Sequence, residues 1–254
     1  MLRRGSRSPR LLVPANSEIA ERFAALEPWR TRFEIEGEPY GGDLDYTGDR
    51  RVAAFFDWFG SPRTILELSS FEGAHTLQLA APPTTGRVLG IEGRKENVER
   101  ARLVEELLGR GNAEFAVDDL EAVDLTAYGR FDATFCAGLL YHLVSPWRLL
   151  GEIARVSDRL FLDTHYWTGP DTVEVDGYVG GWFEEGGYED PLSGLDRRSF
   201  WLTRPSLLKA LTESGWAVHE LVDHENWAGA GARAWLGCVR PGAQSDVRSD
   251  ASTG

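Results

Sequence analysis

The chain has 254 residues, 42% of them hydrophobic, and a formal net charge of -13 at pH 7. This hydrophobic content supports the core of one sizeable domain and argues against a disordered or fibrous protein. The acidic balance argues against non-specific nucleic-acid binding, because attraction to phosphates requires a basic face. A small-molecule substrate is therefore expected, and a nucleic-acid partner is not.

Cysteine usage and hydropathy indicate the compartment. Cys136 and Cys238 both fall in apolar segments, which fits reduced thiols better than a disulfide framework. No stretch approaches the ~20 apolar residues of a membrane-spanning helix, and the N-terminus lacks a secretory pattern. We expect a cytoplasmic protein without a membrane partner, and a homodimer stays open.

The N-terminal part is weakly patterned. The first ten residues hold four arginines, and residues 1–48 are interpreted as a tail and cap segment. The stretch "DRRVAAFFDWFG" then predicts a helix over residues 49–60, with Asp49 as its cap and Gly60 as its stop.

Predicted strands and helices alternate from here. The strands are "TILEL", "RVLGIE", "AEFAV", "FDATFCAG" and "RLFLDTH", and the helices are "AHTLQLA", "KENVERARLVEELLG" and "PWRLLGEIARV". This order predicts a doubly wound α/β domain, a parallel sheet with right-handed crossovers and helices on both faces.

The alternation of strands and helices is interrupted at residues 166–200. This segment is rich in glycine, tryptophan and acidic residues and is interpreted as a lid or substrate insertion. A helix capped by Thr203 follows. The segments "WAVHELV" and "RAWLGCV" then predict an antiparallel pair at the sheet edge. The domain is expected over residues 49–240, with a disordered tail at 241–254.

The turn within "ILELSSFEGAHTLQLA" has the outline of a nucleotide site, which needs close backbone approach and a helix N-terminus. Gly73 supplies the close approach. Glu92 ends the next strand, where its carboxylate can accept hydrogen bonds from ribose hydroxyls.

A dinucleotide-dependent dehydrogenase shares those two features, so the residues that end the third and fourth strands are needed to distinguish a dehydrogenase from other nucleotide-binding enzymes. The third strand ends in Asp118 and Asp119, where a carboxylate can bind the adenine amino group while Leu120 covers the ring. The small residues Ala137 and Gly138 after the fourth strand leave room for a ligand.

At these positions the chain resembles the class I S-adenosylmethionine-dependent methyltransferases, over roughly residues 49–240. The matching stretches are "ILELSSFEG", "VLGIEGRKENVERA", "EFAVDDLEAV" and "FDATFCAGLLYHLVSPWRLLGEIARV", in the family's order. The resemblance implies a Rossmann-like doubly wound sheet, mostly parallel with an antiparallel last strand, plus a lid insertion. "SFWLTRPSLLKAL" is similar to bacterial small-molecule methyltransferases and to tRNA wobble-uridine carboxymethyltransferases.

The glycine turn departs from the family pattern acid-x-Gly-x-Gly-x-Gly. Glu67, Ser69, Phe71 and Gly73 occupy those places. Serine is small enough for close approach but disfavours positive φ, and Phe71 either packs on the sheet or shields the methionine part of the cofactor. We predict that the turn still binds S-adenosylmethionine.

The resemblance also assigns the cofactor's parts to residues. It implies that Glu67 lies near the amino acid end, that Glu92 and Gly93 meet the ribose, and that Asp119 lies near adenine. Tyr46, Arg50 or Arg51 is expected to close over the cofactor.

Methyl transfer is an in-line displacement, so positioning dominates catalysis and a base is needed only for an acceptor that keeps its proton. His142 and His165 follow the fourth and fifth strands and are the candidate bases, each with a structural role as the alternative. Tyr141, Trp167, Trp182 and Trp201 are candidate walls of an acceptor pocket, or simple packing residues.

Acidic groups allow two further interpretations. Glu184 and Glu185 in the insertion either favour a cationic acceptor or form a solvated face. The run 223–226 resembles a hard-cation site, and Asp163 is the one carboxylate placed for a metal-dependent transferase. No metal is expected.

The sequence thus predicts a bacterial methyltransferase that acts on a small molecule, with oxygen favoured and nitrogen or carbon open. The alternatives are a tRNA-modifying carboxymethyl-type transferase, a non-catalytic partner subunit and, last, a nicotinamide-dependent oxidoreductase.

Overall fold

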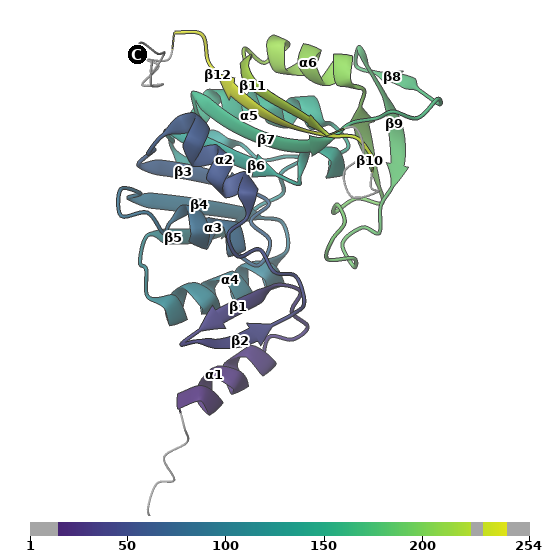
Figure 1. The fold of residues 1–254 in the computed structure, drawn as a ribbon. Helices are drawn as coiled ribbons and strands as arrows, with labels where there is room; N and C mark the ends of the chain where they lie inside the picture. Colours follow the sequence, from purple (N-terminus) through teal and green to yellow (C-terminus); the bar gives the residue numbers. More distant parts are fainter. Residues whose placement is uncertain (1–14, 225–230, 243–254) are drawn as a thin grey trace, which may run out of the picture. The chain divides into compact units, whose positions relative to one another are not determined.

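The structure is a computed structural model that describes residues 15–224 and 231–242 (Figure 1). The chain divides into two compact units, Met1–Asp45 and Tyr46–Gly254. The first contains helix α1 (Ala15–Ala24) and an antiparallel hairpin of β1 (Arg32–Ile35) and β2 (Glu38–Gly41). The segment expected as tail and cap therefore carries regular structure of its own.

The second unit is built on a seven-stranded sheet in the order β11-β12-β7-β6-β3-β4-β5. The strands are β3 (Thr64–Leu68), β4 (Arg87–Glu92), β5 (Ala113–Val117), β6 (Ala133–Ala137), β7 (Arg159–His165), β11 (Ala217–His224) and β12 (Arg233–Val239). Strands β3 to β7 pair in parallel, and β12 runs antiparallel to both β7 and β11. The predicted Rossmann-like sheet with an antiparallel last strand is confirmed.

Helices cover both faces of this sheet (Figure 1). They are α2 (Arg50–Phe59), α3 (Ala74–Leu79), α4 (Lys95–Leu108), α5 (Pro146–Val156) and α6 (Arg204–Glu213), with short 3-10 turns at Leu125–Tyr128 and Leu140–His142. Phe55 of α2 packs edge-on against Phe135 and Phe161 of the sheet. Their strand neighbours Cys136 and Leu162 point to the opposite face and join the core formed with α5 and α6.

The insertion after β7 is itself a small sheet. Strands β8 (Val173–Val175), β9 (Tyr178–Glu184) and β10 (Arg198–Leu202) pair antiparallel, a sheet that the sequence did not predict. Two consecutive glycines in β9 interrupt the alternation of apolar and polar side chains by which a strand is recognised in a sequence. A Cβ on Gly181 would lie 2.2 Å from the Trp167 ring, so the glycine makes room for a tryptophan.

The expectations of a disordered C-terminal tail and of no membrane-spanning helix can be compared with the structure only over the residues that it describes. Of the predicted disordered tail at residues 241–254, residues 243–254 lie outside the described range. Among the residues that the structure does describe, no helix has the length and apolar character needed to cross a membrane.

The turn after β3 keeps a glycine-like backbone without the glycines. Ser69 has φ 62° and Phe71 has φ 51°, both in the left-handed region, and Gly73 has φ 89°. The left-handed conformation costs an L-residue roughly 1–2 kcal/mol. Backbone bonds hold the turn in place: Ser70 N donates to Ile91 O at 3.1 Å, and Gly73 N donates to Ser70 O at 2.8 Å.

Glu67 in β3 is a carboxylic acid buried within the sheet, 1% exposed. Its Oε2 accepts a hydrogen bond from the Thr76 hydroxyl, and its Oε1 lies 3.7 Å from His75 Nδ1. Burial raises the pKa of Glu67 to about 8, against the opposing effects of Thr76 and Arg51. The protonated form is therefore the stable one in the folded chain at neutral pH.

The strained turn makes a stability prediction. Ser69→Gly should raise the free energy of unfolding by up to about 1 kcal/mol, because relief of the left-handed backbone exceeds the roughly 0.5–1 kcal/mol entropic cost of glycine. Ser70→Gly, one residue along and not left-handed, should lower it. Urea unfolding monitored by tryptophan fluorescence measures both. Equal losses in the two variants would show that Ser69 carries no strain.

Glu67 makes a prediction on pH. Its folded pKa of about 8 lies above the ordinary value of 4.5, so the folded state binds the extra proton between those values. The free energy of unfolding of the wild type should therefore fall relative to Glu67→Gln as pH rises through this window, by at most about 1.4 kcal/mol per pH unit. Chemical denaturation from pH 5 to 8 measures the difference. Parallel curves would contradict the buried neutral acid.

Candidate active site

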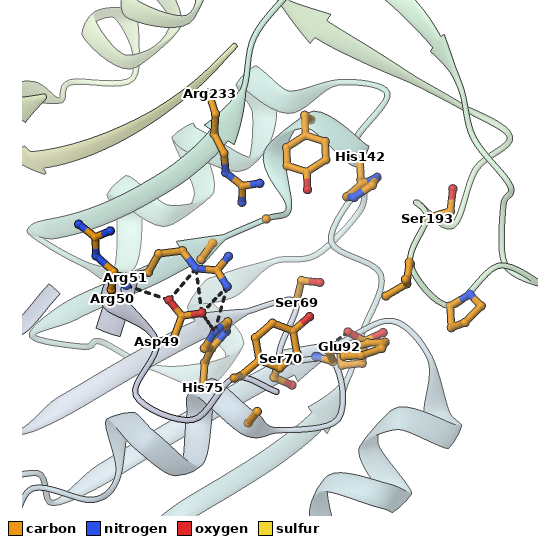
Figure 2. Close-up of a pocket in the computed structure, with 18 of the residues that line it drawn as sticks. Asp49, Arg50, Arg51, Ser69, Ser70, His75, Glu92, His142, Ser193 and Arg233 are labelled. Carbon is orange, nitrogen blue, oxygen red and sulfur yellow. Dashed lines mark hydrogen bonds and ion pairs between the residues drawn. The ribbon is translucent and has the colours of Figure 1, made fainter. Parts of the chain in front are cut away.

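A cavity of about 510 Å³ opens at the carboxyl ends of β3, β4 and β6, where ligands bind in doubly wound sheets (Figure 2). A smaller hollow of about 50 Å³ adjoins it. Ser69, Glu92, Arg94, His142 and Ser193 line both, so the two hollows are adjacent and share these side chains as a common wall.

Glu92 sits at the junction of the two hollows. It is 3% exposed, and its Oε2 accepts from Phe71 N at 3.1 Å while Oε1 accepts from Arg94 N at 3.0 Å. Burial raises the pKa of Glu92, and these two backbone donors oppose the rise. The carboxylate thus braces the left-handed turn and still lines the space where a ribose would lie.

The smaller hollow contains three of the residues predicted to bind the cofactor. Gly93, Asp119 and Leu120 line it, and Leu120 is buried. Asp118 points elsewhere, because its Oδ2 accepts a hydrogen bond from the Tyr128 hydroxyl at 2.8 Å. Of the two adjacent aspartates, Asp119 is therefore the one available to a ligand.

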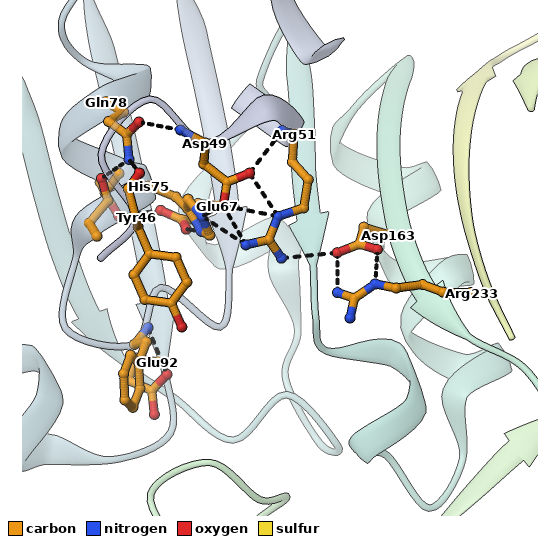
Figure 3. Close-up of polar contacts among 12 residues, drawn as sticks. Tyr46, Asp49, Arg51, Glu67, His75, Gln78, Glu92, Asp163 and Arg233 are labelled. Atoms are coloured by element: carbon orange, nitrogen blue, oxygen red, sulfur yellow. Dashed lines mark hydrogen bonds and ion pairs between the residues drawn. The ribbon is translucent and has the colours of Figure 1, made fainter. Parts of the chain in front are cut away.

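A buried network of charges forms one wall of the large cavity (Figure 3). Asp163, at the end of β7, is 0% exposed and accepts two hydrogen bonds from Arg233 of β12. Arg51 Nη1 binds the same carboxylate at 3.0 Å, and Arg51 also binds Asp49. Burial alone would raise the pKa of Asp49, but hydrogen bonds from His75 and Arg51 hold that pKa below its ordinary value.

Side-chain atoms of Arg51 and Arg233, both members of this network, lie close to Gly138, which has φ 76°. A Cβ at this position would lie 3.8 Å from the Tyr141 hydroxyl, 3.9 Å from Arg233 Nη2 and 4.0 Å from Arg51 Nη1. The glycine thus leaves open a space that three hydrogen-bond donors surround. Such a space suits an oxygen atom of a ligand.

His142 lines both hollows and is oriented from the lid. Its Nδ1 lies 2.9 Å from Oε1 of Glu185, which follows β9. Because an ionised carboxylate only accepts, Nδ1 carries the proton and Nε2 is the basic nitrogen. Burial would raise the pKa of Glu185, but hydrogen bonds from His142, Ser193 and Ser199 hold it at about 2.

His165 lies outside both hollows and is 6% exposed. Its Nδ1 lies 3.0 Å from the carbonyl oxygen of Ala232, which requires a proton on Nδ1, and Nε2 then accepts from Arg233 Nη1 at 3.2 Å. Burial and the nearby Arg233 lower the pKa of His165. With both nitrogens engaged, the ring serves as a support for Arg233 and leaves His142 as the candidate base.

The aromatic residues also separate into two groups. Tyr141 and Trp235 line the large cavity, and burial raises the pKa of the Tyr141 phenol. Trp201 lies behind them, stacked on His165 with ring centroids 5.3 Å apart. Trp182 packs on Phe200 of β10. Of the four aromatic residues predicted as walls of an acceptor pocket, Tyr141 lines the cavity and the three tryptophans do not.

The placement of the predicted residues is as follows. The larger cavity is lined by Ser69, Phe71, Glu92, Ala137, Gly138, Tyr141 and His142, and the smaller hollow adds Gly93, Asp119 and Leu120. Outside both lie Glu67, Gly73, Asp118, His165, Trp167, Trp182 and Trp201. Gly73 has a packing role, because a Cβ there would lie 2.8 Å from the Ala101 side chain.

Sequence reasoning missed two residues of the site, Arg94 and Arg233, whose only signal was a charge within an otherwise structured or apolar stretch. Glu185 was considered only as an acid that favours a cationic acceptor or is solvated, and its contact with His142 was not predicted. Of the suspected cation run, Asp223 accepts a hydrogen bond from the Tyr166 hydroxyl at 2.7 Å, and residues 225–226 lie outside the described range. No cluster of three or more metal-type side chains occurs among residues 15–224 and 231–242.

Comparisons with known proteins agree with this geometry. A family model described as a methyltransferase domain matches residues 65–159. The N-terminal domain of EvdMO1, solved in the presence of SAH and D-fucose, is 40% identical, with 89% of this chain and 97% of that domain covered and a TM-score of 0.79. The chain covers 47% of full-length EvdMO1.

Two further relatives are more distant or more local. The 1,6-didemethyltoxoflavin-N1-methyltransferase of Burkholderia thailandensis shares the fold at 16% identity, over 76% of this chain and 77% of that one, with a TM-score of 0.56. The 23S rRNA (uracil(1939)-C(5))-methyltransferase RlmD of Xylella fastidiosa is 36% identical over 118 residues, 46% of this chain. That match spans about a quarter of RlmD, 26% of its length.

The extent of the EvdMO1 match, the sheet order and the cavity at the carboxyl ends of β3, β4 and β6 lead to one conclusion. The chain belongs to the class I S-adenosylmethionine-dependent methyltransferases.

Proposed function

We propose that this methyltransferase acts on a hydroxyl oxygen of a neutral, hydroxyl-rich small molecule such as a sugar, with His142 as the general base. The observation that carries the proposal is the pairing of His142 with Glu185 at a cavity wall that also presents donors around Gly138. A base beside a set of hydrogen-bond donors suits an acceptor that must lose a proton and has other oxygens to bind.

The residues along the two hollows fit the cofactor. Bound S-adenosylmethionine would supply an electrophilic methyl carbon on its sulfonium, and the neutral thioether would be the leaving group. Glu92 would accept hydrogen bonds from the ribose, Asp119 from the adenine amino group, and Leu120 would cover the ring. Ser69 and Phe71 line the space beside Glu92, where the methionine part would run.

In the proposed reaction, the proton leaves through His142. The acceptor oxygen would take the methyl group, and the departing thioether would keep the electron pair of the broken carbon–sulfur bond. The hydroxyl proton passes to Nε2 of His142, and the resulting imidazolium faces the Glu185 carboxylate through Nδ1. Water then removes the proton. A base in this position contributes ~10²–10⁴-fold to the rate.

The charge pattern favours a neutral acceptor. Arg51 is paired with Asp49, and Arg233 is paired with Asp163, so these two guanidinium groups already have carboxylate partners. Donor hydrogens around Gly138 can still bind hydroxyl oxygens. The presence of D-fucose in the EvdMO1 structure supports a sugar as the acceptor class.

A nucleic-acid acceptor has one observation in its favour, the local likeness to RlmD. The net charge of -13 argues against it. RNA binding with a steep salt dependence, together with methylation of RNA in place of sugars, would support that alternative and overturn the sugar proposal.

The ribose role of Glu92 can be measured by calorimetry. Glu92→Ala should weaken S-adenosylhomocysteine binding by about ten- to a hundredfold, because hydrogen bonds to a charged group are each worth ~1.5–3 kcal/mol. Glu96→Ala, outside both hollows, should bind normally. An analogue without the ribose hydroxyls should bind wild type and Glu92→Ala alike. If Glu92→Ala weakened the binding of S-adenosylhomocysteine and of the analogue equally, Glu92 would only stabilise the turn and would not bind the ribose.

The base role of His142 predicts a separation of turnover from binding. With D-fucose and related sugars as probe acceptors, His142→Ala should lower kcat by ~10²–10⁴-fold while S-adenosylhomocysteine affinity stays nearly unchanged. His219→Ala, on the exposed strand β11, is the matched control and should be fully active. An unaffected rate in His142→Ala would remove the histidine from catalysis.

A further inference from the structure

We propose that Glu185 is the positioning residue of the reaction, a lid carboxylate that fixes the tautomer of His142. This inference rests on the proposed role of His142 as base. The Oε1 atom of Glu185 accepts from His142 Nδ1 at 2.9 Å and from the Ser199 hydroxyl at 2.7 Å. Its Oε2 accepts from Gly194 N at 3.1 Å and from the Ser193 hydroxyl.

The neighbouring glutamate shows that this arrangement is specific. Glu184 ends β9 with an exposed side chain, whereas the Glu185 side chain is 3% exposed against His142. A buried carboxylate is tolerated only when its oxygens are satisfied, and here four donors meet two oxygens. Two adjacent acids in one segment therefore have different roles, one solvated and one directed at the candidate base.

The lid loop that supplies these donors is anchored to the cofactor side. Arg94 Nη2 lies 3.0 Å from Gly187 O, 2.8 Å from Asp190 O and 3.0 Å from Ser193 O. The backbone N of the same arginine binds Glu92. The loop is thus held from two sides, by Arg94, two residues after Glu92, and by Glu185, which contacts His142.

The donors around Glu185 predict what the substitution Glu185→Gln would do. Gly194 N–H can only donate, so the amide side chain of this variant must place its oxygen there. The amide NH₂ group then faces His142 Nδ1 and donates to it. The neutral imidazole would have to carry its proton on Nε2, which removes the basic nitrogen from the cavity.

The test is a ¹⁵N NMR measurement of the imidazole tautomer in the full chain saturated with S-adenosylhomocysteine. The chain has five histidines, and His142→Asn identifies the signals of His142. We expect the Nδ1–H tautomer in the wild type and in Glu184→Gln, and the Nε2–H tautomer in Glu185→Gln. An Nε2–H tautomer in the wild type, or no change in Glu185→Gln, would overturn the inference.

Kinetics then separate this inference from the proposed function. We expect Glu185→Gln to lose roughly ten- to a thousandfold in kcat, and almost nothing further once His142 is alanine. An equal loss in both backgrounds would show that Glu185 acts on the fold and not through His142. A full rate in His142→Ala would sink the proposed base, while the tautomer measurement would still report the Glu185 contact. If Glu185→Gln fails to fold, the wild-type tautomer decides.

Discussion

The site depends on the burial of one carboxylate, Asp163, between two arginines. An isolated charge at 0% exposure is too costly to keep, so Asp163 requires both Arg233 from the antiparallel strand and Arg51 from helix α2. These residues come from three distant parts of the chain. Their joint pairing holds β7, β12 and α2 together at the edge of the cavity, and removal of any one leaves buried charge behind.

Other features of the site follow from that pairing. Arg233 engages Nε2 of His165, which takes that histidine out of acid–base chemistry, and its Nη2 approaches the open space at Gly138. Arg51 approaches the same space through its Nη1. The second histidine, His142, binds Glu185 of the lid instead. The two histidines both follow a strand of the parallel sheet, but one binds Arg233 and the other binds Glu185.

Strain is concentrated at the same end of the sheet. Ser69 and Phe71 hold left-handed conformations that glycine would adopt freely, and the Glu92 carboxylate helps to fix them. Proteins tolerate such local conflicts where function gains from them. Here Phe71 gives the cavity an aromatic side chain that a glycine could not supply.

Local signals in the sequence predicted the fold well. Asp49 and Thr203 cap their helices, Gly109 ends α4 with φ 62°, and strands alternate with helices along the chain, because each of these features depends on near neighbours in the chain. The lid sheet was missed, since its packing demands glycines where a strand pattern would show side chains. The contacts of His142 with Glu185 and of Asp163 with Arg233 join residues far apart in sequence, so no local pattern reports them.

The proposed reaction places the transferred methyl group on an oxygen atom. The most direct measurement is to incubate the enzyme with S-adenosyl-[methyl-¹³C]methionine and a panel of sugars headed by D-fucose, with amine, carbon and RNA acceptors alongside. The ¹³C NMR shift of the transferred methyl identifies the atom that received it. The account predicts an O-methyl signal on a sugar hydroxyl. Label on nitrogen, carbon or RNA, with none on any hydroxyl, would contradict it.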